Sequence, residues 1–80
     1  MIVLTLLSRP ECHLCEQMLS ELEPLVEGRA RIDIVDISDD DVLAARYLFE
    51  IPVLMHGDRE LSRHRLDAGR VIGFLARHGD

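Results

Sequence analysis

Cys12 and Cys15, the two cysteines of the chain, lie three positions apart in the segment RPECHLCEQ, residues 9–17. Two thiols at this spacing can hold a metal ion or pass electrons as a dithiol and a disulfide, or they can be ordinary buried cysteines. A bond between them would close a loop with two intervening residues, and so short a loop removes little chain entropy. The spacing therefore argues against a structural brace and favours chemistry.

The composition describes a small folded domain without the features of a nucleic-acid binder. The chain has 80 residues, of which 48% are hydrophobic, so residues 1–80 are expected to form a single domain with its own core. Its formal net charge is -6, with one Tyr, two Phe and no Trp. Such a domain lacks both the positive potential and the stacking surface that nucleic acids need. We therefore expect no nucleic-acid partner.

The apolar start of the chain, MIVLTLL at residues 1–7, predicts a buried strand rather than a targeting segment. It contains no basic region, and no small-residue cleavage site follows it. A run of this length is also too short to span a bilayer. We therefore expect no membrane contact and a cytoplasmic location, where thiols are kept reduced and a disulfide is usually transient.

The apolar pattern predicts a helix after the cysteines and then a second strand. Apolar residues recur at helical spacing between Cys15 and Val26. Pro24 is expected to end or kink this helix near Glu23, because proline disrupts the helical hydrogen-bond ladder. Residues 29–38, RARIDIVDIS, then alternate in the manner of a strand.

The second half of the chain predicts a helix, a hairpin and a last helix. The second helix is expected to begin after Ser38, which would serve as its N-cap. Residues 51–63 predict two strands around a His-Gly-Asp turn. The last helix is expected to follow Asp67, its cap, and to end at Gly79. The order βαβαββα implies an α/β fold with a mixed four-stranded sheet flanked by helices.

This order of elements predicts different surroundings for the two thiols. Cys15 is in phase with the apolar face of its helix and should face the interior, whereas Cys12 should lie at the helix N-terminus. Unpaired N–H groups and the helix dipole stabilise a thiolate there. Arg9 and a protonated His13 would act in the same direction, and the two glutamates beside the motif would oppose them. We expect Cys12 to be the nucleophile and Cys15 the resolving thiol of a dithiol exchange reaction.

At these residues the sequence resembles the thioredoxin superfamily and, within it, the glutaredoxins. The segment SRPECHLC is similar to the SRPGCHLC that begins a small bacterial glutaredoxin-like family. In these proteins a proline after a hydrophobic residue is cis and faces the C-x-x-C motif, and Pro52 after Ile51 matches it. The resemblance implies a thioredoxin-like fold and a thiol-disulfide oxidoreductase. Arg9, His13, Ile51 and Pro52 are then expected to line the substrate site beside the catalytic Cys12 and Cys15.

The sequence departs from ordinary glutaredoxins at the residues that bind glutathione. His13 and Leu14 stand where Pro-Tyr is usual, and residues 61–67 lack the Gly-Gly pair that allows close backbone approach. We therefore expect weak glutathione binding and no required cofactor. Arg63 and Arg65 could meet a ligand carboxylate, but solvation at the surface is the simpler expectation.

Two other functions remain open at this stage. Cys12 and Cys15 could hold a metal or an iron–sulfur cluster, but structural zinc needs four ligands, and the chain has no second C-x-x-C motif. The chain could also be a thioredoxin-like binding module without turnover. The favoured function implies a monomer whose partner is a disulfide-containing protein or a small thiol.

Overall fold

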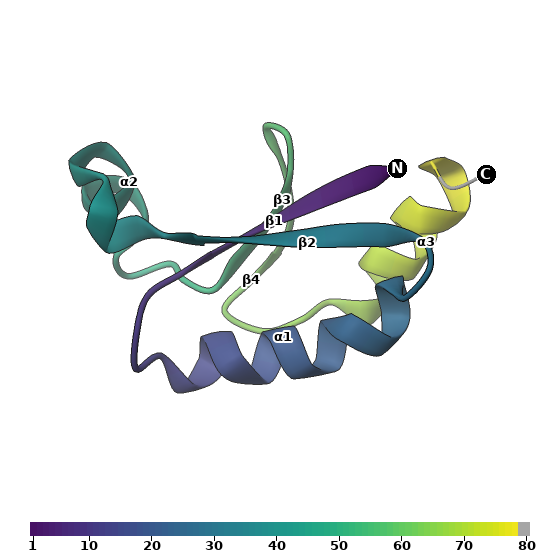
Figure 1. Ribbon diagram of the computed structural model, residues 1–80, viewed down its shortest axis with the longest axis horizontal. Helices are drawn as coiled ribbons and strands as arrows, with labels where there is room; N and C mark the ends of the chain where they lie inside the picture. The colour runs from purple at the N-terminus through teal and green to yellow at the C-terminus, as the bar shows by residue number, and fades with distance from the viewer. Residues whose placement is uncertain (79–80) are drawn as a thin grey trace.

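The computed structural model describes residues 1–78. Its elements follow the predicted order βαβαββα, with one short 3₁₀ helix, η1, before the second α-helix (Figure 1). They are β1 (Ile2–Ser8), α1 (His13–Val26), β2 (Ala30–Asp36), η1 (Ile37–Asp39), α2 (Asp41–Tyr47), β3 (Val53–His56), β4 (Arg59–Arg63) and α3 (Ala68–His78).

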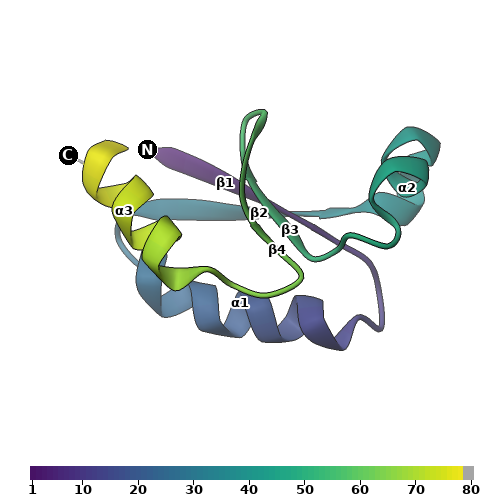
Figure 2. The ribbon, with the colours of Figure 1, turned by 180° about the vertical axis from the view of Figure 1, so that it is seen from behind.

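The four strands form one mixed sheet in the order β2-β1-β3-β4. β1 and β2 are parallel, from the pair Ile2 and Ala30 to the pair Ser8 and Asp36. α1 supplies the crossover that two parallel strands require. β3 is antiparallel to both β1 and β4. The sheet is twisted, so that the β3–β4 hairpin crosses the direction of β2 (Figure 2). The predicted α/β fold is therefore confirmed.

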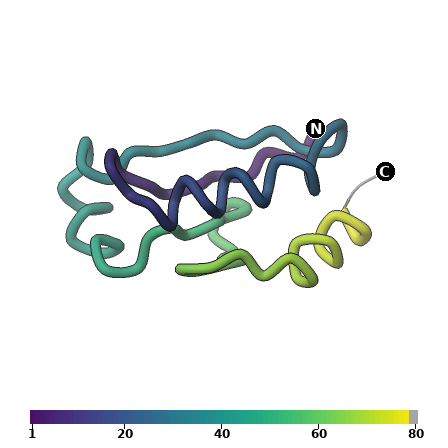
Figure 3. The backbone as a smooth tube through the Cα atoms, turned by 90° about the horizontal axis from the view of Figure 1, so that it is seen from below, coloured from purple at the N-terminus to yellow at the C-terminus, as the bar shows by residue number. Residues whose placement is uncertain are grey.

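The helices are distributed unevenly around the sheet. α1 and α3 contact each other and lie on one face of the sheet, as the view from below shows (Figure 3). The main core lies between this pair and the sheet, and its fully buried residues include Leu4, Leu22, Leu54 and Phe74. α2 lies at one end of the molecule, beyond the last residues of β2 (Figure 1). There it covers a second, smaller core that contains one of the cysteines.

Of the two effects expected of Pro24, the end of the first helix near Glu23 is wrong, because α1 continues through Pro24 to Val26. A proline inside a helix costs about 3 kcal/mol. Leu22 and Val26 are buried on the same face of α1, and each fully buried side chain of this size stabilises the fold by roughly 1.5–3 kcal/mol. Their burial offsets the hydrogen bond that Pro24 cannot donate.

The N-cap of α2 also differs from the prediction. Ser38 lies in η1, where the Asp36 carboxylate accepts bonds from the Ser38 hydroxyl and, at 2.9 Å, from its backbone N–H. These bonds lower the pKa of Asp36. The cap of α2 is Asp40, whose Oδ1 accepts from the N–H groups of Val42 at 2.9 Å and Leu43 at 3.1 Å. A carboxylate that satisfies two free donors at once is the better cap.

Asp40→Ala is expected to lower the free energy of unfolding by about 1 kcal/mol, because two N–H groups of α2 lose their acceptor. For a domain of this size the melting temperature should fall by about 4–8 °C. Asp39→Ala is the matched control, since it removes a neighbouring carboxylate that accepts none of these bonds, and it should cost less than about 0.5 kcal/mol. The free energy of unfolding of each variant is measured by urea denaturation. Equal decreases in Asp40→Ala and Asp39→Ala would show that charge, rather than the cap, stabilises α2.

The last two elements match the prediction more closely. Asp67 caps α3 as expected, with its Oδ1 accepting from the N–H of Arg70 at 3.0 Å. His56 belongs to β3 rather than to the turn, which consists of Gly57 and Asp58. The predicted helix end at Gly79 lies outside the described residues. Between residues 1 and 78, none of the helices has the length and apolar character needed to cross a membrane.

Candidate functional site

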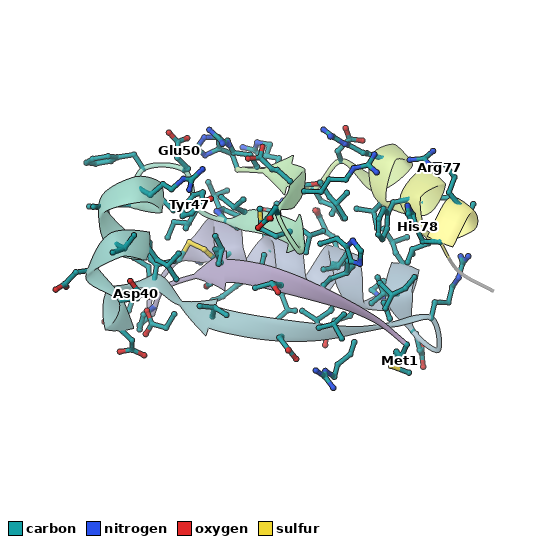
Figure 4. The ribbon with its side chains drawn as sticks, turned by 90° about the horizontal axis from the view of Figure 1, so that it is seen from above. Met1, Asp40, Tyr47, Glu50, Arg77 and His78 are labelled. Carbon is teal, nitrogen blue, oxygen red and sulfur yellow. A yellow bond between two sulfur atoms is a disulfide. The ribbon has the colours of Figure 1, made fainter. Side chains whose placement is uncertain are left out.

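Cys12 and Cys15 form a disulfide at the start of α1, with their Cα atoms 5.2 Å apart. Cys12 is the N-cap of α1 and has extended backbone angles, φ -103° and ψ 104°. Its Sγ accepts a hydrogen bond from the backbone N–H of Cys15 at 3.2 Å. In the view from above, the disulfide lies near Tyr47, at the end of the molecule where α2 is placed (Figure 4). The sulfur of Cys12 thus occupies the position where α1 presents its free N–H groups.

The two sulfur-bearing residues differ in burial. Cys15 is 3% exposed and belongs to the smaller core with Leu7, Ile37 and Val53. Cys12 packs against the same core but remains partly exposed. The phase of α1 explains this difference, because Cys15 shares its buried face with Met18 and Leu22, whereas a cap residue lies outside the helix. A reagent from solvent therefore reaches Cys12 before Cys15.

Arg9 and His13, the two basic residues expected at the site, have exposed side chains. Arg9 lies in the turn between β1 and α1, where Glu11 has a positive φ of 60°. Arg9 also lines a hollow with Ile34 and Asp36 of β2. His13 is the first residue of α1. Their proposed effect on the Cys12 thiolate stays a prediction.

The Ile51–Pro52 peptide bond is cis in the structure. Ile51 packs in the same small core as Cys15, so the fold brings this segment to the disulfide. The N–H of Ile51 donates to the carbonyl of Tyr47 at 3.1 Å, and the carbonyl of Pro52 accepts from the N–H of His64 at 2.8 Å. An incoming peptide segment can therefore accept a hydrogen bond from the backbone N–H of Ile51 only if the bond of that N–H to Tyr47 breaks.

A group of ion pairs that the sequence did not indicate lies next to this segment, since Glu50 precedes Ile51 and His64 bonds to Pro52. Arg63 Nη1 donates to Glu50 Oε2 at 3.0 Å, while its Nη2 and Nε donate to the carboxylate of Glu60 at 2.7 and 3.2 Å. His64 Nε2 lies 3.4 Å from the same Glu50 oxygen. The hydrogen bonds to Glu60 raise the pKa of Arg63 above its usual value. Arg63 is thus engaged by two carboxylates of the protein itself rather than simply solvated.

A groove of about 230 Å³ lies between α1 and the segment that follows β4. On one side it is lined by residues of α1, beginning with Leu14 between the two cysteines, and on the other by His64, Arg65 and Leu66. The groove is thus lined by Leu14, the residue before Cys15, and by His64, which contacts Glu50. Within residues 1–78 there is no set of three or more His, Cys, Asp or Glu side chains arranged to hold a metal ion.

This fold and this cysteine pair define a thioredoxin-like protein. The family model described as "Glutaredoxin-like domain (DUF836)" matches residues 3–76. The chain therefore belongs to this glutaredoxin-like family, as its cysteine motif predicted. None of the curated proteins matches the chain.

Solved structures show the same fold. Protein Ne2328 from Nitrosomonas europaea superposes with a TM-score of 0.79 at 28% sequence identity, with 91% of this chain and 89% of that chain covered. Target protein XcR50 from X. campestris is 33% identical, with a TM-score of 0.69 and coverages of 92% and 96%. A malarial protein at 18% identity has a TM-score of 0.63, with 96% of each chain covered, and supports the fold alone.

Proposed function

We propose that this protein is a thiol-disulfide oxidoreductase in which Cys12 is the nucleophile and Cys15 the resolving thiol. The observation that carries the proposal is the cysteine pair at the start of α1, with one partly exposed and one buried member. Exchange by a dithiol needs this asymmetry, because one thiol must meet the substrate and the other must wait in reach. The glutaredoxin-like family supports the same chemistry.

The reaction transfers two electrons from the dithiol to the substrate disulfide. The Cys12 thiolate attacks one substrate sulfur, forms a mixed disulfide and expels the other sulfur as a thiolate. Cys15 loses its proton and attacks Sγ of Cys12, which forms the Cys12–Cys15 disulfide and releases the second substrate thiol. The protons lost by the two cysteines end on the two released thiols. A thiol reductant then returns the pair to the dithiol form.

The N–H of Cys15 has a direct part in this reaction. It already donates to Sγ of Cys12 at 3.2 Å, and a thiolate at the same place accepts that bond more strongly because it carries charge. The bond and the N-terminal dipole of α1 therefore favour ionisation of Cys12. Cys15 lies on the buried face of α1, so this bond and this dipole do not assist its ionisation in the same way.

The proposed substrate is a disulfide-containing protein or a small disulfide, met by a monomer in the cytoplasm. Ile51 and Pro52 are proposed to meet the substrate through the backbone of Ile51, because both side chains are buried. The packing of Ile51 in the small core with Cys15 supports this placement. Arg9 and His13 are proposed to line the substrate site and to favour the Cys12 thiolate through their charge.

A redox titration tests the proposal. The protein is equilibrated in dithiothreitol or glutathione buffers from about -320 to -120 mV, free thiols are alkylated, and the masses are measured. We expect both thiols to be lost together in one reversible two-electron transition. A second assay measures reduction of a disulfide substrate at catalytic protein concentration. Thiols that stay reduced throughout would contradict the proposal, and a reversible disulfide without turnover would favour the binding module instead.

A further inference from the structure

The ion-paired group beside Ile51 and Pro52 leaves no guanidinium nitrogen of Arg63 unbonded. Nη1 donates to Glu50, and Nε and Nη2 donate to Glu60. His64 adds a contact of 3.4 Å to Glu50. The fold therefore brings two carboxylates to one guanidinium and one imidazole. The basic side chains that could attract a ligand carboxylate are therefore already paired with the protein's own carboxylates.

Glu50 adjoins the segment that the proposed function assigns to the substrate. It directly precedes Ile51, which packs in the core of Cys15. Its partner His64 donates a hydrogen bond from its backbone N–H to the carbonyl of Pro52. His64 also lines the groove that includes Leu14. We take a disulfide that reacts at Cys12 to extend along this groove to His64, where the protein carboxylate in contact with that imidazole is Glu50.

We propose that Glu50 is a specificity-determining residue that turns the site away from anionic disulfides and towards uncharged or cationic ones. The inference rests on the proposed function and names its substrate class. An anionic ligand such as glutathione disulfide has to displace the Glu50 carboxylate from Arg63 and His64 or accept its repulsion. A cationic ligand finds in Glu50 a carboxylate with which it can pair. Specificity thus comes from a repulsive element built into the site.

The test uses the prereduced full-length protein, whose dithiol supplies both electrons, and three small disulfides of different charge. They are glutathione disulfide, which is anionic, 2-hydroxyethyl disulfide, which is uncharged, and cystamine, which is cationic. The rate constant for oxidation of Cys12 and Cys15 is measured by quenching with an alkylating agent. Each rate constant is divided by that of the uncharged disulfide, which removes changes in the intrinsic reactivity of Cys12.

Glu50→Gln is expected to raise the relative rate with glutathione disulfide and to lower the relative rate with cystamine. Each change should be about threefold, the factor by which two unit charges about 6 Å apart in water alter a rate constant. Both changes should vanish near 1 M salt, because screening then acts within about 3 Å. Arg63→Gln leaves Glu50 without its cation, so it should shift both ratios in the opposite direction. Glu27→Gln, which makes the same charge change at the far end of α1, should leave the ratios as in the wild type.

Unchanged ratios in both Glu50→Gln and Arg63→Gln would overturn the inference while leaving the oxidoreductase in place. Equal shifts in Glu50→Gln and Glu27→Gln would also overturn it, because net charge would then explain the preference. If none of the three disulfides oxidises the wild-type pair, the proposed function itself fails, and the inference fails with it. Circular dichroism of each variant shows whether the fold is kept, and opposite shifts in two folded variants cannot arise from partial unfolding.

Discussion

Cys12→Ser is expected to abolish thiol-disulfide exchange, whereas Cys15→Ser should keep the first half of the reaction and accumulate a mixed disulfide on Cys12. The first substitution removes the thiol that solvent-borne substrates can reach, and the remaining Cys15 is 3% exposed. The second removes the thiol that would release the substrate. The loss in Cys12→Ser should be complete, down to the rate of the buffer alone, because a hydroxyl is not an effective nucleophile at its ordinary pKa.

The measurement is the mass of each variant after incubation with a disulfide in excess and alkylation. The chain holds no other cysteine, so any adduct on Cys15→Ser must be on Cys12. The variant with both cysteines replaced by serine gives the background. An adduct on Cys12→Ser together with none on Cys15→Ser would reverse the two roles. Such a result would mean that the small core opens in solution far enough to expose Cys15.

The sequence predicted the site best where one periodic pattern determines both fold and chemistry. The apolar phase that buries Met18 and Leu22 also buries Cys15, so the asymmetry of the two thiols follows from helix geometry. The same phase places Cys12 before the first turn, where it is the N-cap. Such local rules need no knowledge of distant contacts.

Predictions that depended on a choice between nearby alternatives were less successful. Ser38 and Asp40 are both good N-cap residues, and only the path of the chain after β2 decides between them. Pro24 breaks an isolated helix, but in this fold the burial of Val26 keeps the last turn of α1 in place. In both cases tertiary structure outweighs a local preference that the sequence states correctly.

The ion-paired group could not be found from the sequence. Glu50 and Arg63 are 13 positions apart, and their contact depends on the hairpin between them, whose register shifts at Leu54 and Met55. His64 has a positive φ of 67°, a conformation that is unusual for a residue other than glycine. A glycine would have indicated such a turn, whereas the stretch Ser62–Arg65 suggests only a polar surface.

Phe74→Ala is expected to have the largest effect on stability of any single substitution in the main core. Phe74 is fully buried on α3, and its ring lies 4.7 Å from that of His56 and 4.3 Å from that of His78, between centroids. The guanidinium of Arg59 lies 5.8 Å from the ring centre. Truncating a buried phenylalanine costs about 3–5 kcal/mol. The free energy of unfolding of a domain of this size is roughly 4–12 kcal/mol, so the variant should be close to unfolding at 37 °C.

Ile72→Ala on the same helix is the matched control, because Ile72 is 48% exposed, and it should cost less than about 1 kcal/mol. Both variants are unfolded in urea in the oxidised state, so that the disulfide contributes equally. Phe74 belongs to the main core and Cys15 to the smaller one. Phe74→Ala should therefore leave the Cys12–Cys15 reduction potential of the folded protein unchanged at low temperature. A potential that moves with the stability would mean that the two cores act as one unit, and that the disulfide depends on packing far from α2.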